Sequence, residues 1–176
     1  MTERYFFAEQ DRTVRDCIRL EGFDAVNGPR KIPLGGDWEK INDATFLSIK
    51  PGREETVLDF YQSPVLMVSA RIRQVFARLE PEIQWKRVYL VCRERESSYP
   101  LFIPLIPMMD GLSSQVSRYP DGRERQVILD CEKCRGRHVF FLQNSAARRP
   151  IMSLQAAEAI FREDIIGLNI QEVEVS

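Results

Sequence analysis

The hydrophobic pattern of residues 63–81 predicts a buried strand followed by a helix. Residues Val65–Val68 form an unbroken apolar run, which is typical of a strand buried on both faces. Ser69 stands where its hydroxyl can cap a helix. Four apolar residues then follow at i, i+3, i+4 and i+7, namely Ile72, Val75, Phe76 and Leu79. Because Pro81 disfavours helical backbone in the residue before it, the pattern predicts a helix over Ala70–Leu79.

The same order of elements recurs near the C-terminus. Residues Pro150–Met152 resemble a short strand, and Ser153 stands at the cap position. A helix is predicted over Leu154–Glu163, with a core-facing stripe of Leu154, Ala157, Phe161 and Ile165. We therefore expect Phe161, like Phe76 in the first unit, to be buried in the core.

Further strands are predicted wherever apolar and β-branched residues cluster between turn signals. They are Arg4–Ala8, Cys17–Leu20, Thr45–Ile49, Trp85–Cys92, Tyr99–Ile106, Arg125–Asp130, Arg137–Leu142 and Leu168–Val175. Pro100 and Pro104 cannot donate to a strand ladder, so Tyr99–Ile106 is expected at a sheet edge or at a bulge.

The predicted fold class is α+β: a mostly antiparallel sheet with two short Ser-capped helices packed on it. Most connections are of hairpin length, which suits antiparallel pairing. We expect a single domain over residues 1–176. Its N-terminal part, residues 1–57, is looser in pattern than the core over residues 58–175.

Composition narrows the class of protein. The chain is 44% hydrophobic and 29% charged, which is typical of globular proteins. A net charge of −1 gives no general attraction to nucleic acid or to anionic membranes. There is no apolar run of the roughly 18 residues that a membrane span needs, and Met1–Gln10 does not resemble a secretory signal. The four scattered cysteines do not suggest a disulfide scaffold, so we expect a cytoplasmic protein with reduced thiols.

One cysteine pair deserves a chemical interpretation. Cys131 and Cys134 have the spacing of a zinc knuckle, with His138 as a third ligand and Cys92 as a conceivable fourth. A redox role would require the pair at a helix N-terminus after a strand. The third possibility is two structural cysteines in a turn between strands.

Arginines are concentrated between residues 118 and 149. The candidate partner-binding residues are Arg118, Arg123, Arg125, Arg135, Arg137, Arg148 and Arg149. They are compatible with a solvated face, with a surface for an acidic protein, or with a nucleic-acid patch. The breaker-rich stretch Gly22–Trp38 is a second candidate surface. No nucleophile motif or phosphate-binding loop is present, so neither an enzyme nor a cofactor is indicated.

Several of these stretches together resemble a bacterial protein family. Residues Leu58–Ser69 resemble its central signature, a D-F-x-x-S-P-x-x-x-V-S pattern before a helix. Strands similar to Val88–Val91 and Tyr99–Leu101 follow, then an LD strand end at Leu129–Asp130 and a strand similar to Gly136–Leu142. The family is the immunity proteins of polymorphic-toxin systems, in the branch first described as a domain of unknown function from Firmicutes and myxobacteria.

The resemblance implies a non-enzymatic protein that binds a cognate protein toxin in the cytoplasm and neutralises it by occlusion. It implies no nucleic-acid, membrane or small-molecule partner. The alternative is a small zinc-stabilised regulatory or interaction module that uses Cys131 and Cys134.

Overall fold

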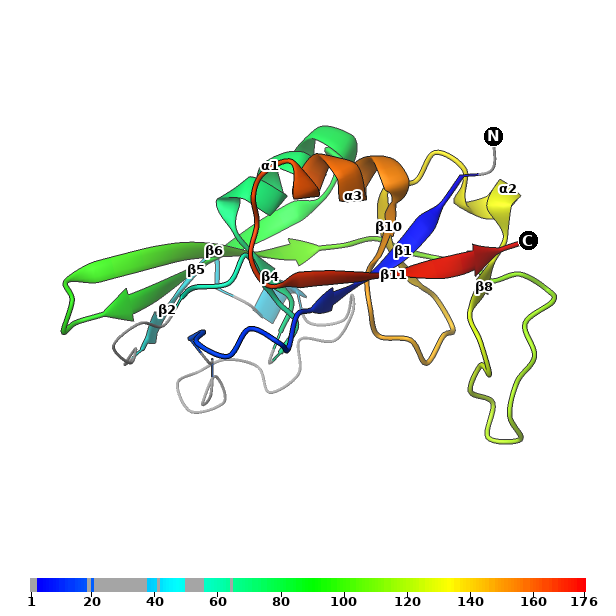
Figure 1. Ribbon diagram of the computed structural model, residues 1–176, viewed down its shortest axis with the longest axis horizontal. Coiled ribbons are helices and arrows are strands. Elements are labelled where there is room, and N and C mark those ends of the chain that lie inside the picture. The colour runs from blue at the N-terminus through cyan, green and yellow to red at the C-terminus, as the bar shows by residue number, and fades with distance from the viewer. Residues whose placement is uncertain (1–2, 19, 21–37, 41, 50–55, 64) are drawn as a thin grey trace.

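The computed structural model describes residues 3–18, 20, 38–40, 42–49, 56–63 and 65–176, and they build two β-sheets with the two longer helices on one side (Figure 1). The six-stranded sheet runs in the order β7 (Met108–Met109), β9 (Val139–Leu142), β10 (Ile151–Ser153), β1 (Tyr5–Gln10), β11 (Leu168–Val175), β8 (Ile128–Leu129). The five-stranded sheet runs β2 (Ala44–Ser48), β5 (Gln84–Cys92), β6 (Ser97–Leu105), β4 (Met67–Val68), β3 (Phe60–Tyr61). The helices are α1 (Ala70–Leu79), α2 (Cys131–Cys134) and α3 (Leu154–Phe161), with a 3-10 turn η2 (Trp38–Lys40).

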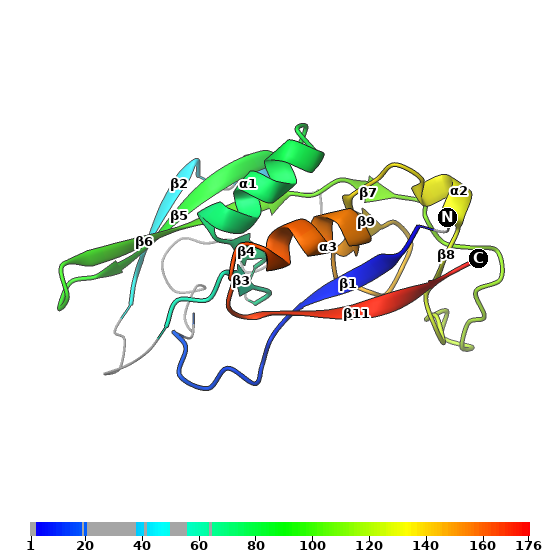
Figure 2. The same ribbon diagram turned by 45° about the horizontal axis from the view of Figure 1, so that its top comes forward.

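The predicted α+β class is confirmed. Within the described strands, six pairings are antiparallel, and three are parallel: β2 with β5, β7 with β9, and β8 with β11. Helices α1 and α3 lie side by side over the place where the two sheets meet (Figures 1 and 2).

A shared core joins the sheets. It contains Phe6 and Met152 from the six-stranded sheet, Val68 and Phe102 from the five-stranded sheet, and buried residues of both longer helices. Side chains alternate along each strand, so each sheet has a second packed face. The second face of the six-stranded sheet buries Tyr5 and is covered by the chain around β8 and α2. The second face of the five-stranded sheet packs on apolar residues of the N-terminal part.

Helix α1 occupies the predicted residues. Ile72, Val75 and Phe76 are buried, and Glu80 before Pro81 has left helical backbone. Ser69 is at the N-cap, as predicted, but its side chain makes no cap hydrogen bond, and its buried Oγ has no partner among the described residues.

The phase of α3 was predicted wrongly. The helix ends at Phe161 rather than at Glu163, and its buried residues are Ala156, Ala157 and Ile160. Phe161 is 47% exposed. Apolar residues occupy most positions of this short helix, so its own pattern does not decide which side faces the sheet. The cap was predicted correctly, because Ser153 Oγ accepts a hydrogen bond from the Ala156 amide.

Strand β6 does not lie at the sheet edge, contrary to the prediction. It lies between β5 and β4. The amide of Arg87 and the carbonyl of Val91 form hydrogen bonds on the β2 side. The odd-numbered residues of β5 therefore point their backbone N–H and C=O groups away from β6. Pro100 and Pro104 pair with two of these odd residues, so their nitrogens face the β4 side. Strand β4 reaches β6 only at Phe102, so neither proline nitrogen faces a ladder donor position.

Two other predicted strands are shorter in the structure. The stretch Arg125–Asp130 contains only β8, because Asp130 becomes the N-cap of α2. Cys17–Leu20 contributes a single bridge from Cys17 to Thr56. Gly167 has a positive φ of 93°, and a Cβ there would lie 2.8 Å from the Cβ of Leu58, so the chain before β11 needs glycine.

Candidate functional site

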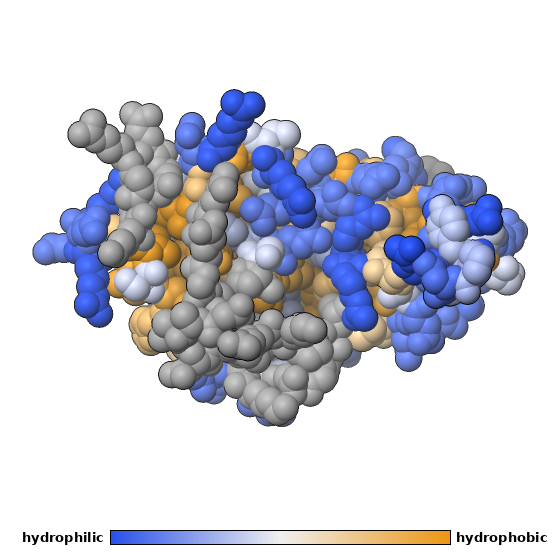
Figure 3. Space-filling view, turned by 90° about the horizontal axis from the view of Figure 1, so that it is seen from below, coloured by the Kyte–Doolittle hydropathy of each residue, from blue (hydrophilic) through white to orange (hydrophobic). Residues whose placement is uncertain are grey.

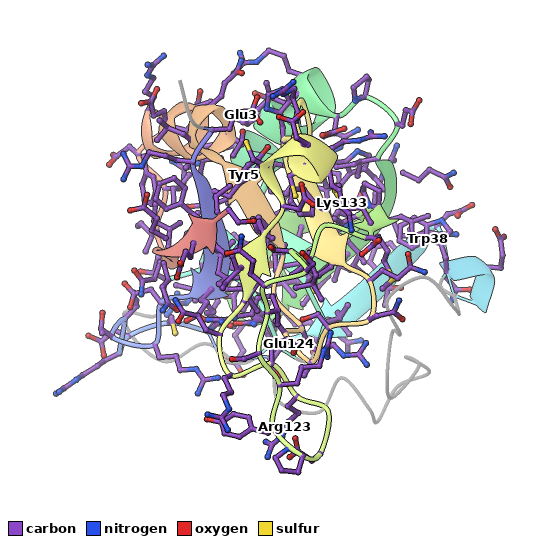
Figure 4. All side chains as sticks on the ribbon, turned by 90° about the vertical axis from the view of Figure 1, so that its right-hand side faces the viewer. Glu3, Tyr5, Trp38, Arg123, Glu124 and Lys133 are labelled. Carbon is purple, nitrogen blue, oxygen red and sulfur yellow. The ribbon has the colours of Figure 1, made fainter. Side chains whose placement is uncertain are left out.

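The predicted arginine surface is divided among three connections. Arg118, Arg123 and Arg125 lie in the loop before β8, Arg135 and Arg137 follow α2, and Arg148 and Arg149 precede β10. Viewed from the side, Arg123 and Glu124 lie on the loop at one end of the molecule, whereas Lys133 of α2 lies well away from them (Figure 4). The seven side chains therefore come from three separate connections of the chain.

Most of these guanidinium groups are paired with carboxylates of this chain. The pairs are Arg118–Glu124 at 3.0 Å, Arg123–Asp121 at 2.7 Å, Arg137–Glu80 at 3.9 Å, Arg135–Glu132 and Arg149–Glu9. Arg125 lies over the ring of Tyr119, 5.0 Å from its centroid. Arg148 is exposed and has no ion pair with any described residue. An acidic partner would have to compete with acids that are already in place.

Three of the arginines line a groove of about 370 Å³ on the sheet face opposite α3. Arg123, Arg125 and Arg149 line it together with Glu124, Glu172 and Glu174. The guanidinium of Arg149 stacks on Phe7, with its carbon 3.9 Å from the ring centroid, and partial burial lowers its pKa. Seen from below, the right-hand end of the molecule is mainly hydrophilic (Figure 3). The groove is thus lined by as many acidic as basic residues.

The cysteine pair lies in a one-turn helix rather than in a simple turn. Helix α2 follows β8 directly, and the Asp130 carboxylate accepts hydrogen bonds from the amides of Glu132 and Lys133. Burial, followed by the nearby Asp130 carboxylate, raises the pKa of Cys134 to about 12. That direction is opposite to the lowered pKa of a redox-active thiol.

The other ligands expected for a zinc site are engaged elsewhere or buried. The ring of His138 lies with Nδ1 2.9 Å from Ser153 Oγ, and Cys92 is buried in the five-stranded sheet. Among the described residues, no three His, Cys, Asp or Glu side chains come together in a way that could hold a metal ion.

The Ser153–His138 pair lies at the N-cap of α3 and lacks the geometry of a catalytic triad among the described residues. Ser153 Oγ already accepts the Ala156 amide at 3.2 Å as a helix cap. The nearby Glu80 carboxylate accepts the backbone amide of His138 at 2.6 Å and does not orient its ring. A catalytic triad needs the carboxylate on the imidazole.

The acidic residue of the Leu58–Ser69 signature is also structural. The Asp59 carboxylate is almost fully buried and accepts hydrogen bonds from the Arg71 side chain at 2.8 and 3.2 Å. It also accepts the Ile166 amide at 2.8 Å, while Arg71 donates to the carbonyls of Glu163 and Asp164. Asp59 thus ties the start of α1 to the loop between α3 and β11, which explains an acidic residue at this position.

Sequence reasoning missed an exposed aromatic pair. Phe46 on β2 is 66% exposed, and its ring stacks on Tyr89 of β5 with centroids 5.2 Å apart and planes at 16°. The available signal was the adjacent Phe46–Leu47, since neighbouring strand residues face opposite sides and one of them must leave the core. Of the second predicted surface, Gly22–Trp38, only Trp38 lies within the described residues.

Comparison with known proteins is informative about the family. No helix within the described residues has both the length and the apolar character for a membrane crossing. A search among curated proteins found no match. The sequence profile of the immunity protein family (Imm11) matches residues 3–175, nearly the whole chain. The chain therefore belongs to the immunity protein family Imm11.

Proposed function

We propose that this protein is a cytoplasmic immunity protein that binds a cognate bacterial toxin and neutralises it by occlusion, without catalysis. The observation that carries the proposal is the family match over residues 3–175. The roles of the polar groups support it, because the Asp59, Ser153 and Glu80 side chains bond to backbone or to structural partners.

Occlusion and catalysis differ in stoichiometry. A protein that covers a toxin's active site inhibits one toxin molecule per molecule of inhibitor, and its effect is set by affinity. An enzyme that modified the toxin would inactivate many toxin molecules in turn. The number of toxin molecules neutralised per molecule of this protein therefore separates the two mechanisms.

The test uses the toxin encoded by the neighbouring reading frame. Its activity is titrated with the purified protein at concentrations well above the dissociation constant. We expect inhibition to end at one equivalent and an isolable complex of the same composition. Complete inactivation by a small fraction of an equivalent, with no stable complex, would refute occlusion.

The arginines near α2 and β10 are tested in the same titration. Arg135 and Arg137 have internal carboxylate partners, whereas Arg148 is exposed. Exposed rim charges mainly alter association rates, so we propose a secondary electrostatic role for this group. Reversing all three to Glu should change the association rate more than the dissociation rate. A large rise in the dissociation rate would make them part of the main contact instead.

A further inference from the structure

The aromatic pair Phe46 and Tyr89 lies on an unusual edge strand. β2 is the outermost strand of the five-stranded sheet, and its five residues, Ala-Thr-Phe-Leu-Ser, include no charge and no proline. Natural edge strands are commonly protected by charged residues, prolines or bulges. An edge with a 66% exposed phenylalanine lacks these protections. Such a feature is typical of a surface that a partner covers.

The pair belongs to a larger uncovered face. The hairpin of β5 and β6, with β2 beside it, projects past the end of α1 in both ribbon views (Figures 1 and 2). Val88 and Leu90 pack into the core on the far side, so Arg87, Tyr89 and Val91 point to the α1 side. Strand register places Phe46 and Pro100 on either side of Tyr89. Pro100 is exposed and Val91 is half-buried, so the centre of this face is apolar.

The helix and strands that form this face carry basic charges only. The elements α1, β2, β5 and β6 contain no Asp or Glu, in a chain with 26 acidic residues. They contain five basic residues, Arg71, Arg73, Arg78, Lys86 and Arg87. Two of these form ion pairs with carboxylates outside the four elements: Arg71 with Asp59, and Lys86 with Asp43.

Two arginines beside the apolar centre, Arg73 and Arg87, have no carboxylate partner among the described residues. Arg87 is exposed and makes no ion pair with a described residue. Arg73 lies over the rings of Phe102 at 4.5 Å and Trp85 at 5.7 Å, and its buried Nε has no hydrogen-bond partner within the described chain. Both guanidinium groups are therefore available to carboxylates of another molecule, which they bind strongly in bidentate geometry.

We propose that the β2–β5–β6 face, made of Phe46, Arg73, Arg87, Tyr89 and Pro100, is the surface that docks the toxin, through a toxin patch with an apolar centre and acidic neighbours. This inference rests on the proposed function. An aromatic centre with arginines beside it is the composition of interface hot spots. Nucleic acid fits less well, because phosphate binding depends on many cations. Only three of the five basic residues, Arg73, Arg78 and Arg87, lack an ion pair with a described residue, and the chain has a net charge of −1.

The test compares matched substitutions by binding kinetics with the purified neighbouring-gene toxin. Phe46→Glu and Arg87→Glu change the proposed face. Phe161→Glu and Arg162→Glu are the controls, because Phe161 is a comparably exposed phenylalanine on α3 and Arg162 is an exposed arginine that follows it. Thermal unfolding of each variant shows that it is folded, and Phe46→Ala provides a milder version of the first change.

We expect Phe46→Glu to weaken binding by about 30-fold or more, which is the loss at a hot spot. Arg87→Glu should slow association by about tenfold at low salt, with a smaller effect at high salt. Both control variants should bind within about twofold of the unmodified protein.

Each other outcome has a separate meaning. If the unmodified protein binds no toxin, the proposed function fails, and the face has no role to explain. If it binds and Phe46→Glu binds equally well, only the docking face is wrong. A dimer of the unmodified protein that Phe46→Glu dissociates would assign the face to a second copy. If Phe46→Glu lost binding to a single-stranded RNA oligonucleotide while its binding to the toxin stayed unchanged, the face would be assigned to nucleic acid.

Discussion

The two helix-cap serines should behave differently when changed to alanine. Both stand at N-caps with nearly the same extended backbone, with φ and ψ of −70° and 170° at Ser69 and −68° and 161° at Ser153. From sequence alone, each substitution would cost the usual ~0.5–2 kcal/mol of a lost cap. The structure separates them, because only Ser153 uses its hydroxyl.

The expected difference follows from the hydrogen bonds of each hydroxyl. Ser153 Oγ accepts the Ala156 amide at 3.2 Å and lies 2.9 Å from His138 Nδ1. Losing both contacts should cost about 1.5–2.5 kcal/mol, near the upper end for a cap. The Ser69 hydroxyl is buried without a partner among the described residues. Because its removal relieves a desolvation cost, Ser69→Ala should be neutral or up to about 1 kcal/mol more stable.

Urea unfolding followed by circular dichroism measures both effects. With a slope of about 1–3 kcal/mol per M, a gap of ~2 kcal/mol separates the two midpoints by roughly 1 M. Equal losses of stability in the two variants would show that Ser69 does cap α1 in solution. A neutral Ser153→Ala would show that the cap and its histidine contact contribute nothing.

Four more outcomes are expected. Asp59→Ala should lose about 2–4 kcal/mol in urea unfolding, because it removes a buried carboxylate that holds Arg71 and the Ile166 amide; a loss below ~1 kcal/mol would contradict this role. Phe76→Ala should cost ~3–5 kcal/mol because Phe76 is fully buried, whereas Phe161→Ala should change stability by less than ~1 kcal/mol. With a thiol reagent at pH 8, Cys131 should react first and the three buried thiols only on unfolding, since Cys134 combines burial with a raised pKa; a second fast thiol would contradict the assignment. Because one core joins both sheets, we propose a single domain, and near- and far-UV circular dichroism should report one coincident unfolding transition.

The sequence by itself determined the elements whose signals are local. Helix α1 has the predicted bounds, because a clear apolar stripe and Pro81 lie within the same short stretch. The β5–β6 hairpin and β11 were found for the same reason, since alternation and turn residues are neighbours in the chain. The family-like signature over Leu58–Ser69 was also recognisable from the sequence. The structure explains its acidic residue, because the Asp59 carboxylate accepts the Ile166 amide.

The candidate site depended on contacts between distant residues. Arg149 is paired with Glu9 and Arg137 with Glu80, so the charge pattern of residues 118–149 did not reveal how few guanidinium groups are available. The ring of Phe46 stacks on Tyr89 only because β2 pairs in parallel with β5. No local signal in the sequence encodes this pairing.

Only the tertiary structure decided which of several equivalent local choices is used. Phe161 and Ile160 are both apolar neighbours in α3, and the position of the sheet selects Ile160 for burial. Ser69 and Ser153 have the same backbone, yet only Ser153 has an amide and a histidine within reach. The local pattern of a segment fixes its periodicity. The burial and hydrogen bonds of each residue depend on partners that folding brings together, and these partners are not encoded within the segment itself.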